Sequence, residues 1–220
     1  MTLAHELGHA FHNLNLYDNP PLATSYSMPV AETASNFNEV VTMDYALKNA
    51  KSKAEKLTLL EGKISDTAQI ICDIYSRYLF EKSVIDNREE TFYNADGFAE
   101  LMTKAQKASY GDGLDENYLH PYMWVCKSHY YEASLSFYNW PYAFGGLFAQ
   151  GLFAEYSKRG QSFIADYKKM LKETPVRDAE DVAKIAGVDL TDEKFWDEGL
   201  KYFENLIEEF CSLSDELFNL

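Results

Sequence analysis

The run His5-Glu6-Leu7-Gly8-His9, near the start of the sequence, constrains the fold more than any other feature. Residues four apart share one face of an α-helix, so His5 and His9 can bind one metal ion while Glu6 lies beside a metal-bound water. The segment from Thr2 to Leu16 has the apolar periodicity of an amphipathic helix. The pattern predicts a hydrolytic zinc site on one helix, with Glu6 as the general base.

Apolar side chains and histidines occupy adjoining faces of this helix. A lone histidine is more often packed or solvated than bound to a metal, but a cluster of histidines around a glutamate favours the metal site. The apolar face consists of Leu3, Leu7, Ala10, Phe11 and Leu14, and the adjoining face carries His5, His9 and His12.

A catalytic zinc ion usually has three protein ligands and one water, so one more ligand is required. Glu32 is the best candidate, because Pro29 can begin a helix and the loop from Asp18 to Met28 can fold that helix back against the first. Glu39 lies two turns after Glu32, where it can hydrogen-bond a ligand imidazole, and Asn36 is a competing choice. Two imidazoles and one carboxylate then bind one zinc ion.

Several runs closely resemble the oligoendopeptidase F family, which is related to thimet oligopeptidase. They are Thr2–His12, Ala31–Ser35, Phe37–Glu39, His129–Tyr131 and Phe137–Phe148. The resemblance implies a cytosolic zinc endopeptidase that cuts short peptides. It covers most of the chain and is weaker after about Lys158.

The resemblance also implies roles for individual residues. It assigns the zinc ligands and the general base to the residues that the motif indicates, namely His5, His9, Glu32 and Glu6. In that family a histidine and tyrosines of the second region face the substrate carbonyl. The candidates for stabilising the oxyanion are therefore His129, Tyr138 and Tyr142, with His120 as a second choice to His129.

Members of that family are much longer, and a large helical region before their zinc helix forms one wall of the substrate channel. The resemblance therefore covers a C-terminal catalytic half. Two other interpretations stay open: a catalytically incomplete, zinc-containing peptide-binding domain that lacks this wall, and a structural zinc site with His12 as the fourth ligand. The sequence leaves open whether the active species is a monomer, a self-associated oligomer or a complex with a separate N-terminal half.

Composition excludes several classes of partner. The formal net charge of -15 argues against nucleic acid and against an anionic membrane surface. Three widely spaced cysteines indicate reduced thiols in a cytoplasmic protein. We expect no signal peptide, because the first four residues lead directly into the motif, and the longest apolar stretch, Pro141–Ala154, is too short to span a bilayer.

The apolar periodicity predicts an all-α multi-helix bundle. Together with the motif, the resemblance implies that residues 1–220 form a single helical zinc metallopeptidase catalytic domain. One short extended piece is expected near Trp124–His129. After the first two helices, the predicted helices are Lys56–Gly62, Ile64–Lys82, Glu100–Tyr110, Phe137–Arg159, Ser162–Lys172, Ala179–Ala186 and Asp192–Leu213.

Overall fold

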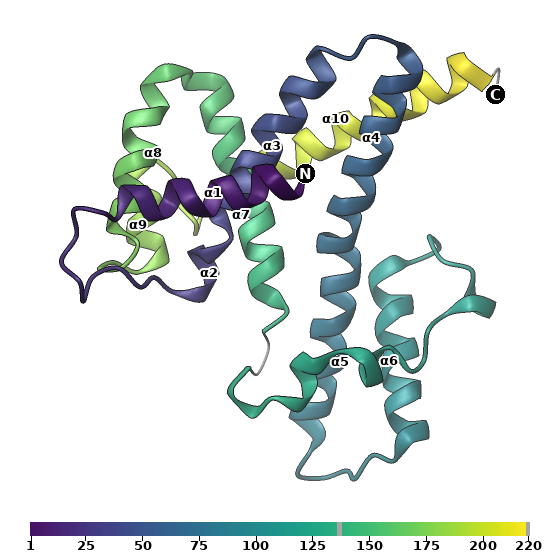
Figure 1. Ribbon diagram of the computed structural model, residues 1–220. Coiled ribbons are helices and arrows are strands. Elements are labelled where there is room, and N and C mark those ends of the chain that lie inside the picture. The colour runs from purple at the N-terminus through teal and green to yellow at the C-terminus, as the bar shows by residue number, and fades with distance from the viewer. Residues whose placement is uncertain (136–137, 219–220) are drawn as a thin grey trace. The chain divides into compact units, whose positions relative to one another are not determined.

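The computed structural model describes residues 1–135 and 138–218, and every regular element in these residues is a helix (Figure 1). The α-helices are α1 (Thr2–Asn15), α2 (Met28–Ala31), α3 (Thr33–Lys48), α4 (Lys53–Ala68), α5 (Ile74–Asn87), α6 (Ala95–Tyr110), α7 (Trp140–Arg159), α8 (Gln161–Glu173), α9 (Ala179–Ile185) and α10 (Glu193–Phe218). The predicted all-α fold is confirmed. Phe137, which the sequence places at the start of a helix, lies outside the described residues.

Two of the sequence predictions need correction. The helices expected at Lys56–Gly62 and Ile64–Lys82 form one continuous helical stretch, in which a π-helical turn at Gln69–Asp73 joins α4 to α5. Gly62 does not end the helix, because a single glycine inside a helical pattern costs only about 1 kcal/mol.

The extended piece expected near Trp124–His129 is also wrong. This segment consists of the 3-10 turns Met123–Cys126 and Ser128–Tyr131, and only Lys127 between them has an extended backbone. Two more 3-10 turns, Glu116–Tyr118 and Ala133–Leu135, flank it. Met123, Trp124 and Tyr130 pack these turns against the core that Phe80 and Met102 form with their neighbours.

The chain divides into two compact units. The first unit consists of Met1–Thr67 and Phe144–Leu220, and the second unit consists of Ala68–Ala143. The prediction of one catalytic domain over the whole chain stays a prediction. Within the described residues, none of the helices has the length and apolar character that a bilayer crossing requires.

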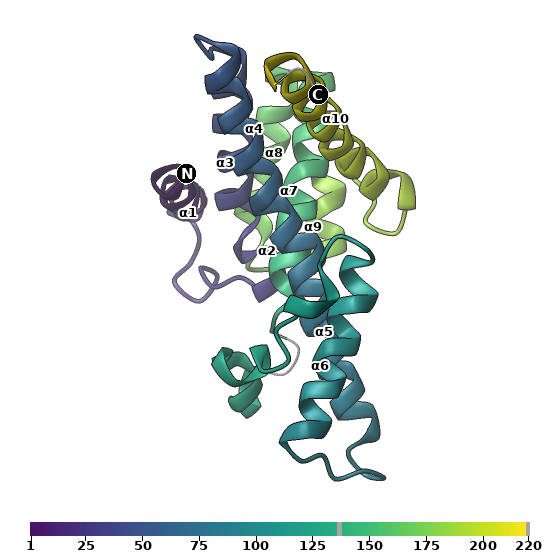
Figure 2. The same ribbon diagram turned by 90° about the vertical axis from the view of Figure 1, so that its right-hand side faces the viewer.

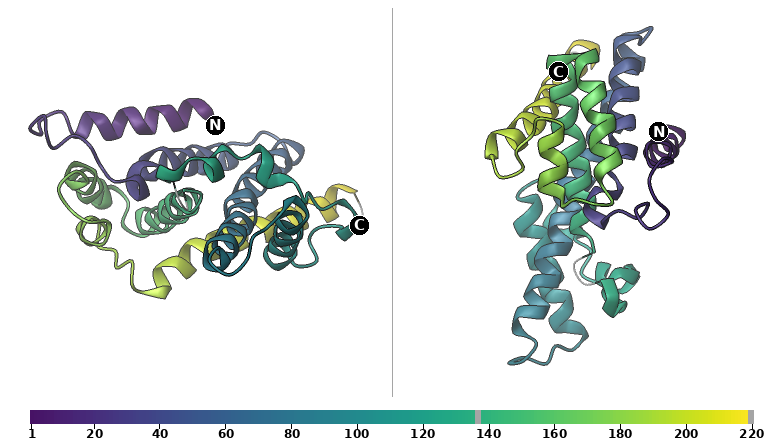
Figure 3. Two further views of the ribbon diagram at one scale, coloured as in Figure 1. Left: turned by 90° about the horizontal axis from the view of Figure 1, so that it is seen from below. Right: turned by 90° about the vertical axis from the view of Figure 1, so that its left-hand side faces the viewer.

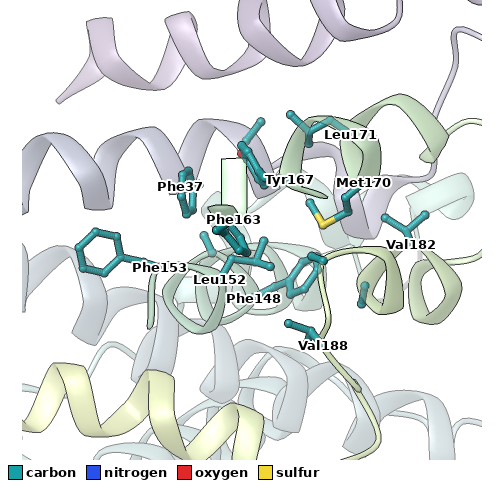
Figure 4. Packing of buried hydrophobic residues seen from close by; sticks show 14 of the residues in the cluster. Phe37, Phe148, Leu152, Phe153, Phe163, Tyr167, Met170, Leu171, Val182 and Val188 are labelled. Atoms are coloured by element: carbon teal, nitrogen blue, oxygen red, sulfur yellow. The ribbon is translucent and has the colours of Figure 1, made fainter. Parts of the chain in front are cut away.

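Aromatic and aliphatic side chains from five helices form the core of the first unit (Figure 4). Phe37 of α3 packs against Tyr167 of α8 with ring centroids 4.5 Å apart, and Phe148 of α7 packs against Phe195 of α10 at 5.9 Å. Such pairs add about 0.5–1.5 kcal/mol each beyond the burial of their area. The core therefore fixes α3, which carries one side of the predicted metal site.

Helix α1 lies along α3 (Figure 3), and part of its apolar face is open to solvent. Gly8 and His12 are the buried residues of α1, whereas the exposed fractions of Leu3, Leu7 and Leu14 are 74%, 54% and 71%. A Cβ atom on Gly8 would lie 2.4 Å from the Ala34 carbonyl oxygen of α3. The side of α1 that bears Gly8 and the histidines therefore faces the unit, because glycine lets the two backbones touch.

In the second unit, α5 and α6 lie side by side (Figure 2). Their shared core contains Phe80, Met102 and Ala105, all at most 5% exposed. Trp124 and Tyr130, from the 3-10 turns, pack against this core. The turns are thus held by aromatic side chains.

The close approach at Gly8 gives a test of the packing. Gly8→Ala should lower the free energy of unfolding by about 1–3 kcal/mol, because the new methyl group meets backbone atoms of α3 that cannot rotate away. Gly62→Ala is the matched control: nothing lies within 4 Å of its added Cβ, so it should raise stability by about 0.5–1 kcal/mol. Urea unfolding followed by circular dichroism measures both. A Gly8→Ala protein as stable as the wild type would contradict the packing.

Candidate metal centre

The three predicted ligands come together in the first unit. His5 and His9 project from α1, and Glu32 lies at the break between α2 and α3. Their ligand atoms all lie within 4.8 Å of one another. In the part of the chain that the structure describes, no other group of three His, Cys, Asp or Glu side chains is as close.

The spacing of these atoms fits a tetrahedral ion. His9 Nε2 lies 3.2 Å from His5 Nε2, and Glu32 Oε2 lies 3.3 Å from His5 Nε2 and 3.5 Å from His9 Nε2. Two ligands on a tetrahedral zinc ion with bonds of about 2.1 Å would be about 3.4 Å apart. The exposed fractions of the three side chains are 26–28%, so solvent reaches the group.

Glu39 orients one of the imidazoles. Its Oε1 lies 3.2 Å from His5 Nδ1, and a carboxylate can only accept, so the proton of neutral His5 lies on Nδ1. The lone pair of His5 Nε2 is then available to a metal ion placed between Glu32 Oε2 and His9 Nε2. Glu39, rather than the competing Asn36, therefore makes the predicted contact.

A buried lysine near Glu39 was not foreseen. Lys63 of α4 is only 8% exposed, and burial lowers its pKa while the charge of Glu39 opposes that shift. The two opposite charges offset part of each other's cost of burial. Lys63 lies between the two helices that the periodicity predicted, so its burial carried no signal in the sequence.

Glu32 is held in place by Ser35 and by close packing. The hydroxyl of Ser35, which is fully buried, lies 3.0 Å from Glu32 Oε2 and 3.0 Å from the Glu32 carbonyl oxygen. A Cβ atom on Gly145 of α7 would lie 2.9 Å from Glu32 Cβ, so a glycine there leaves room for the ligand. The sequence offered a signal for Ser35, because a serine three residues after a helix-terminal glutamate can reach back to it.

His12 does not join the metal group, which contradicts the alternative that it is a fourth ligand. Its side chain is fully buried, and Nε2 lies 2.8 Å from Thr174 Oγ1. The Thr174 hydroxyl donates to the Leu171 carbonyl oxygen, so it accepts from His12. Burial lowers the pKa of His12 from 6.5 to about 4, and His12 is therefore neutral at pH 7.

Tyr26, in the loop between α1 and α2, stacks on His12 and lies within the electrostatic influence of the Glu32 carboxylate. Its ring stacks on His12 with centroids 4.0 Å apart and an angle of 13°. Burial raises the pKa of Tyr26, and the charge of Glu32 raises it further. The loop is thus packed against α1 close to the metal group, which the sequence did not indicate.

Glu6 is exposed on α1, between the two imidazoles in sequence. No hydrogen bond or ion pair of its carboxylate occurs within residues 1–135 and 138–218. A carboxylate in this state can accept a proton from a solvent molecule. Its role as a general base stays a prediction.

The oxyanion candidates belong to the second unit and lie together there. The His129 ring stacks on Tyr138 at 5.2 Å and meets Tyr142 edge-on at 6.1 Å, and the two tyrosine rings are 5.6 Å apart. Burial, followed by the charges of Arg77 and Lys127, lowers the pKa of His129. The second choice, His120, has an exposed side chain. The role of these residues at a substrate carbonyl stays a prediction.

The model of peptidase family M3 matches residues 1–202 of the chain. Oligopeptidase PepF from Bacillus subtilis is 28% identical over 217 residues, which are 96% of this chain and 32% of the relative. An oligoendopeptidase F homologue from Borreliella burgdorferi is 28% identical over 213 residues, which are 94% of this chain and 35% of that protein. The chain thus spans about a third of the length of these relatives.

Two solved structures have the same fold. The structure of a putative peptidase from Chlamydophila abortus matches with a TM-score of 0.85 at 24% identity, over 96% of this chain and 35% of the other. The structure of oligoendopeptidase-F from Enterococcus faecium matches with a TM-score of 0.79 at 22% identity, over 98% and 39%.

The contact between Glu39 and His5 predicts an effect on metal affinity. Glu39→Gln should weaken zinc binding by about 10–100-fold, because the neutral amide no longer stabilises the Nδ1 proton as a carboxylate does. Zinc affinity is measured by competition with a chelator. Glu61→Gln, an exposed site on α4, is the control and should bind as the wild type does. Equal affinities for all three proteins would refute the orienting role.

The buried His12 predicts how stability depends on pH. Its pKa is about 4 in the folded chain and 6.5 when exposed, so the unfolded chain takes up the proton first as pH falls. The stabilising contribution is fully present above about pH 6.5 and is lost between there and about pH 4, a total of about 3 kcal/mol.

Urea unfolding of the metal-free chain at several pH values measures this loss. The stability difference between the wild type and His12→Gln should shrink as pH falls from 7 to 4.5. His120→Gln, which changes an exposed imidazole, should stay parallel to the wild type. A constant difference between His12→Gln and the wild type would show that His12 does not resist protonation.

Proposed function

Because the chain belongs to peptidase family M3, we propose that it carries the metal centre of a zinc-dependent endopeptidase that hydrolyses short peptides. The observation that carries the proposal is the group of His5, His9 and Glu32, whose ligand atoms have the spacing of a tetrahedral zinc site. Relatives named oligopeptidases match nearly the whole chain, which favours peptides as substrates.

In this proposal, different residues of the chain have different roles in peptide hydrolysis. One zinc ion held by the group would act as a Lewis acid and lower the pKa of a bound water to about 7. Glu6 would accept the proton of the attacking water and return it to the leaving amine. Glu39 would keep the His5 proton on Nδ1, and Ser35 would hold the Glu32 carboxylate in position.

His129, Tyr138 and Tyr142 would stabilise the negative charge that develops on the former carbonyl oxygen. Hydroxyl groups and a neutral imidazole can donate hydrogen bonds without a fixed countercharge. The lowered pKa of His129 favours the neutral form at pH 7. Each donor of this kind contributes about 3 kcal/mol to lowering the barrier.

A zinc-containing domain that binds peptides without cleaving them is the second candidate. The exposed row Leu3, Leu7 and Leu14 favours an additional partner for α1, since apolar side chains that share a helix face are usually covered. A second copy of the chain or a separate N-terminal half would provide that cover and complete the site. The three cysteines are free, which suits the cytoplasmic location expected from the sequence.

Substitution of Glu6 separates binding from catalysis. Glu6→Gln should retain one zinc ion per chain and reduce cleavage by about 10²–10⁴-fold, because the amide cannot accept the water proton. Mass spectrometry of a mixed library of short peptides, with and without chelator, measures cleavage. Glu61→Gln should cleave as the wild type does.

Three other outcomes would each contradict a different part of the proposal. An active Glu6→Gln protein would exclude Glu6 as the general base. A wild-type chain that binds one zinc ion but cleaves nothing would favour the non-catalytic peptide-binding domain. A wild-type chain that binds no zinc would overturn the metal site itself.

A further inference from the structure

Arg77 of α5 is a buried cation to which the proposed function gives no role. Its exposed fraction is 6%, and its guanidinium forms an ion pair with Asp73, which lies one helix turn earlier and is also 6% exposed. Asp73 ends the π-helical turn Gln69–Asp73, and such turns occur frequently at functional sites. The ion pair compensates the charge of Arg77, but it does not connect α5 with any other segment.

The guanidinium makes that connection through its other terminal nitrogen. Arg77 Nη1 donates to Asn139 Oδ1 at 3.3 Å, while Nη2 is engaged by Asp73. Arg77 and Asn139 are 62 positions apart in the sequence, and Asn139 is only 1% exposed. Because a guanidinium presents its donors in a rigid plane, this contact fixes the Asn139 side chain relative to α5.

Asn139 lies between two of the oxyanion candidates. It follows Tyr138 directly, and its carbonyl oxygen accepts from the Tyr142 backbone N–H at 3.2 Å, at the start of α7. Arg77 therefore holds the side chain of a residue whose backbone begins the helix turn that carries Tyr142. Both tyrosine side chains are half-buried, so part of each ring remains open to solvent.

A second contact joins the His129 segment to the same place on α5. The Tyr130 hydroxyl donates to the Arg77 carbonyl oxygen at 3.4 Å, and the Tyr130 ring meets Phe80 edge-on at 5.2 Å. Burial raises the pKa of Tyr130, which keeps the phenol protonated and able to donate. Arg77 thus contacts the neighbour of His129 through its backbone and the neighbour of Tyr138 through its side chain.

All of these residues belong to the second unit. Within that unit the His129 ring stacks on Tyr138 at 5.2 Å, and the two tyrosine rings are 5.6 Å apart, so a shift of Asn139 would change both contacts. A buried ion pair is often no more stabilising than apolar side chains of the same volume. The geometry that Arg77 fixes therefore explains its burial better than stability alone.

We propose that Arg77 is a positioning residue, which holds Tyr138 and Tyr142 against His129 through its hydrogen bond to Asn139. Because Arg77 is buried, it acts through Asn139 and not on a substrate. The arrangement of the three rings depends only on contacts inside the second unit. Its consequence for cleavage rests on the proposed function, in which these rings stabilise the oxyanion.

Two variants break the contact in different ways. Arg77→Lys keeps a positive charge beside Asp73, but one ammonium nitrogen replaces the two guanidinium nitrogens that divide between Asp73 and Asn139. Asn139→Leu keeps the approximate size of the side chain and removes the acceptor. Arg88→Lys, at the exposed end of α5, is the matched control. Circular dichroism and urea unfolding establish that each variant is folded.

NMR of the metal-free chain with isotope-labelled histidine measures the arrangement without turnover. The spectra are recorded at pH 8, above the usual pKa of histidine, so that changes in signals do not report protonation. The ring-proton signals of His129, assigned with His129→Gln, should move towards those of the exposed His120 in both variants, because the ring current of Tyr138 is lost. The His12 signals should stay unchanged, and Arg88→Lys should change none.

Two results of this experiment would overturn the proposal. Wild-type His129 signals in both variants would show that the rings keep their places without Arg77. Changes in the His12 signals as well would show a general loss of structure, since His12 belongs to the first unit.

Cleavage data test the consequence for catalysis. Arg77→Lys should reduce kcat by about 10–100-fold and leave KM unchanged, because the oxyanion develops only in the transition state. Arg77→Lys combined with Tyr138→Phe should lose much less than the product of the two single losses, because both changes disable the same group. Losses that multiply would show that Arg77 does not act through Tyr138.

The two measurements separate this proposal from the proposed function. Altered His129 signals with an unchanged kcat would leave the positioning in place and contradict the oxyanion role. A reduced kcat with unaltered His129 signals would overturn the positioning and leave the peptidase in place. If the wild type cleaves no peptide, the proposed function is contradicted, and the His129 signals still decide the positioning.

Discussion

The close contact between α1 and α3 is the constraint on which the metal group depends. Two imidazoles on one helix can be spaced by that helix alone, but the third ligand must come from another segment at a fixed distance. Gly8 lets the α1 backbone touch α3 at Ala34 and Ser35, one turn beyond Glu32. The aromatic core beneath α3 then holds that helix in place. A longer side chain at position 8 would push α1 away from α3. It would thereby separate His5 and His9 from Glu32, although the ligands themselves stay the same.

The sequence could predict the parts of the site that follow from helix geometry. The spacing of His5 and His9 fixed their common face. Pro29 indicated the start of a helix just before Glu32, although the break at Glu32 between α2 and α3 was not predicted. The two-turn spacing from Glu32 to Glu39 also led to the observed contact with His5. These relations depend on local periodicity, which can be read directly from a sequence.

Relations between distant segments were not predictable in the same way. The sequence gives no register between α1 and α8, so the bond from His12 to Thr174 had no local signal. The same limit applies to the apolar row Leu3, Leu7 and Leu14 on α1, since periodicity identifies a face but not which neighbour covers it. At Trp124–His129 a short extended piece was expected, but the segment forms 3-10 turns, because Trp124 and its neighbour Tyr130 pack onto the core of α5 and α6.

The position of Glu32, beyond the loop that follows α1, has a further consequence for the stability of the chain. An ion bound by His5, His9 and Glu32 would cross-link α1 to the start of α3 and close the intervening loop, much as a disulfide does. Because the three ligands are not held together in the unfolded chain, the ion would bind the folded chain preferentially, and its binding free energy would add to the free energy of unfolding. The metal would thus stabilise the architecture of the first unit as well as any reaction, and loss of the ion would first loosen the loop that contains Tyr26.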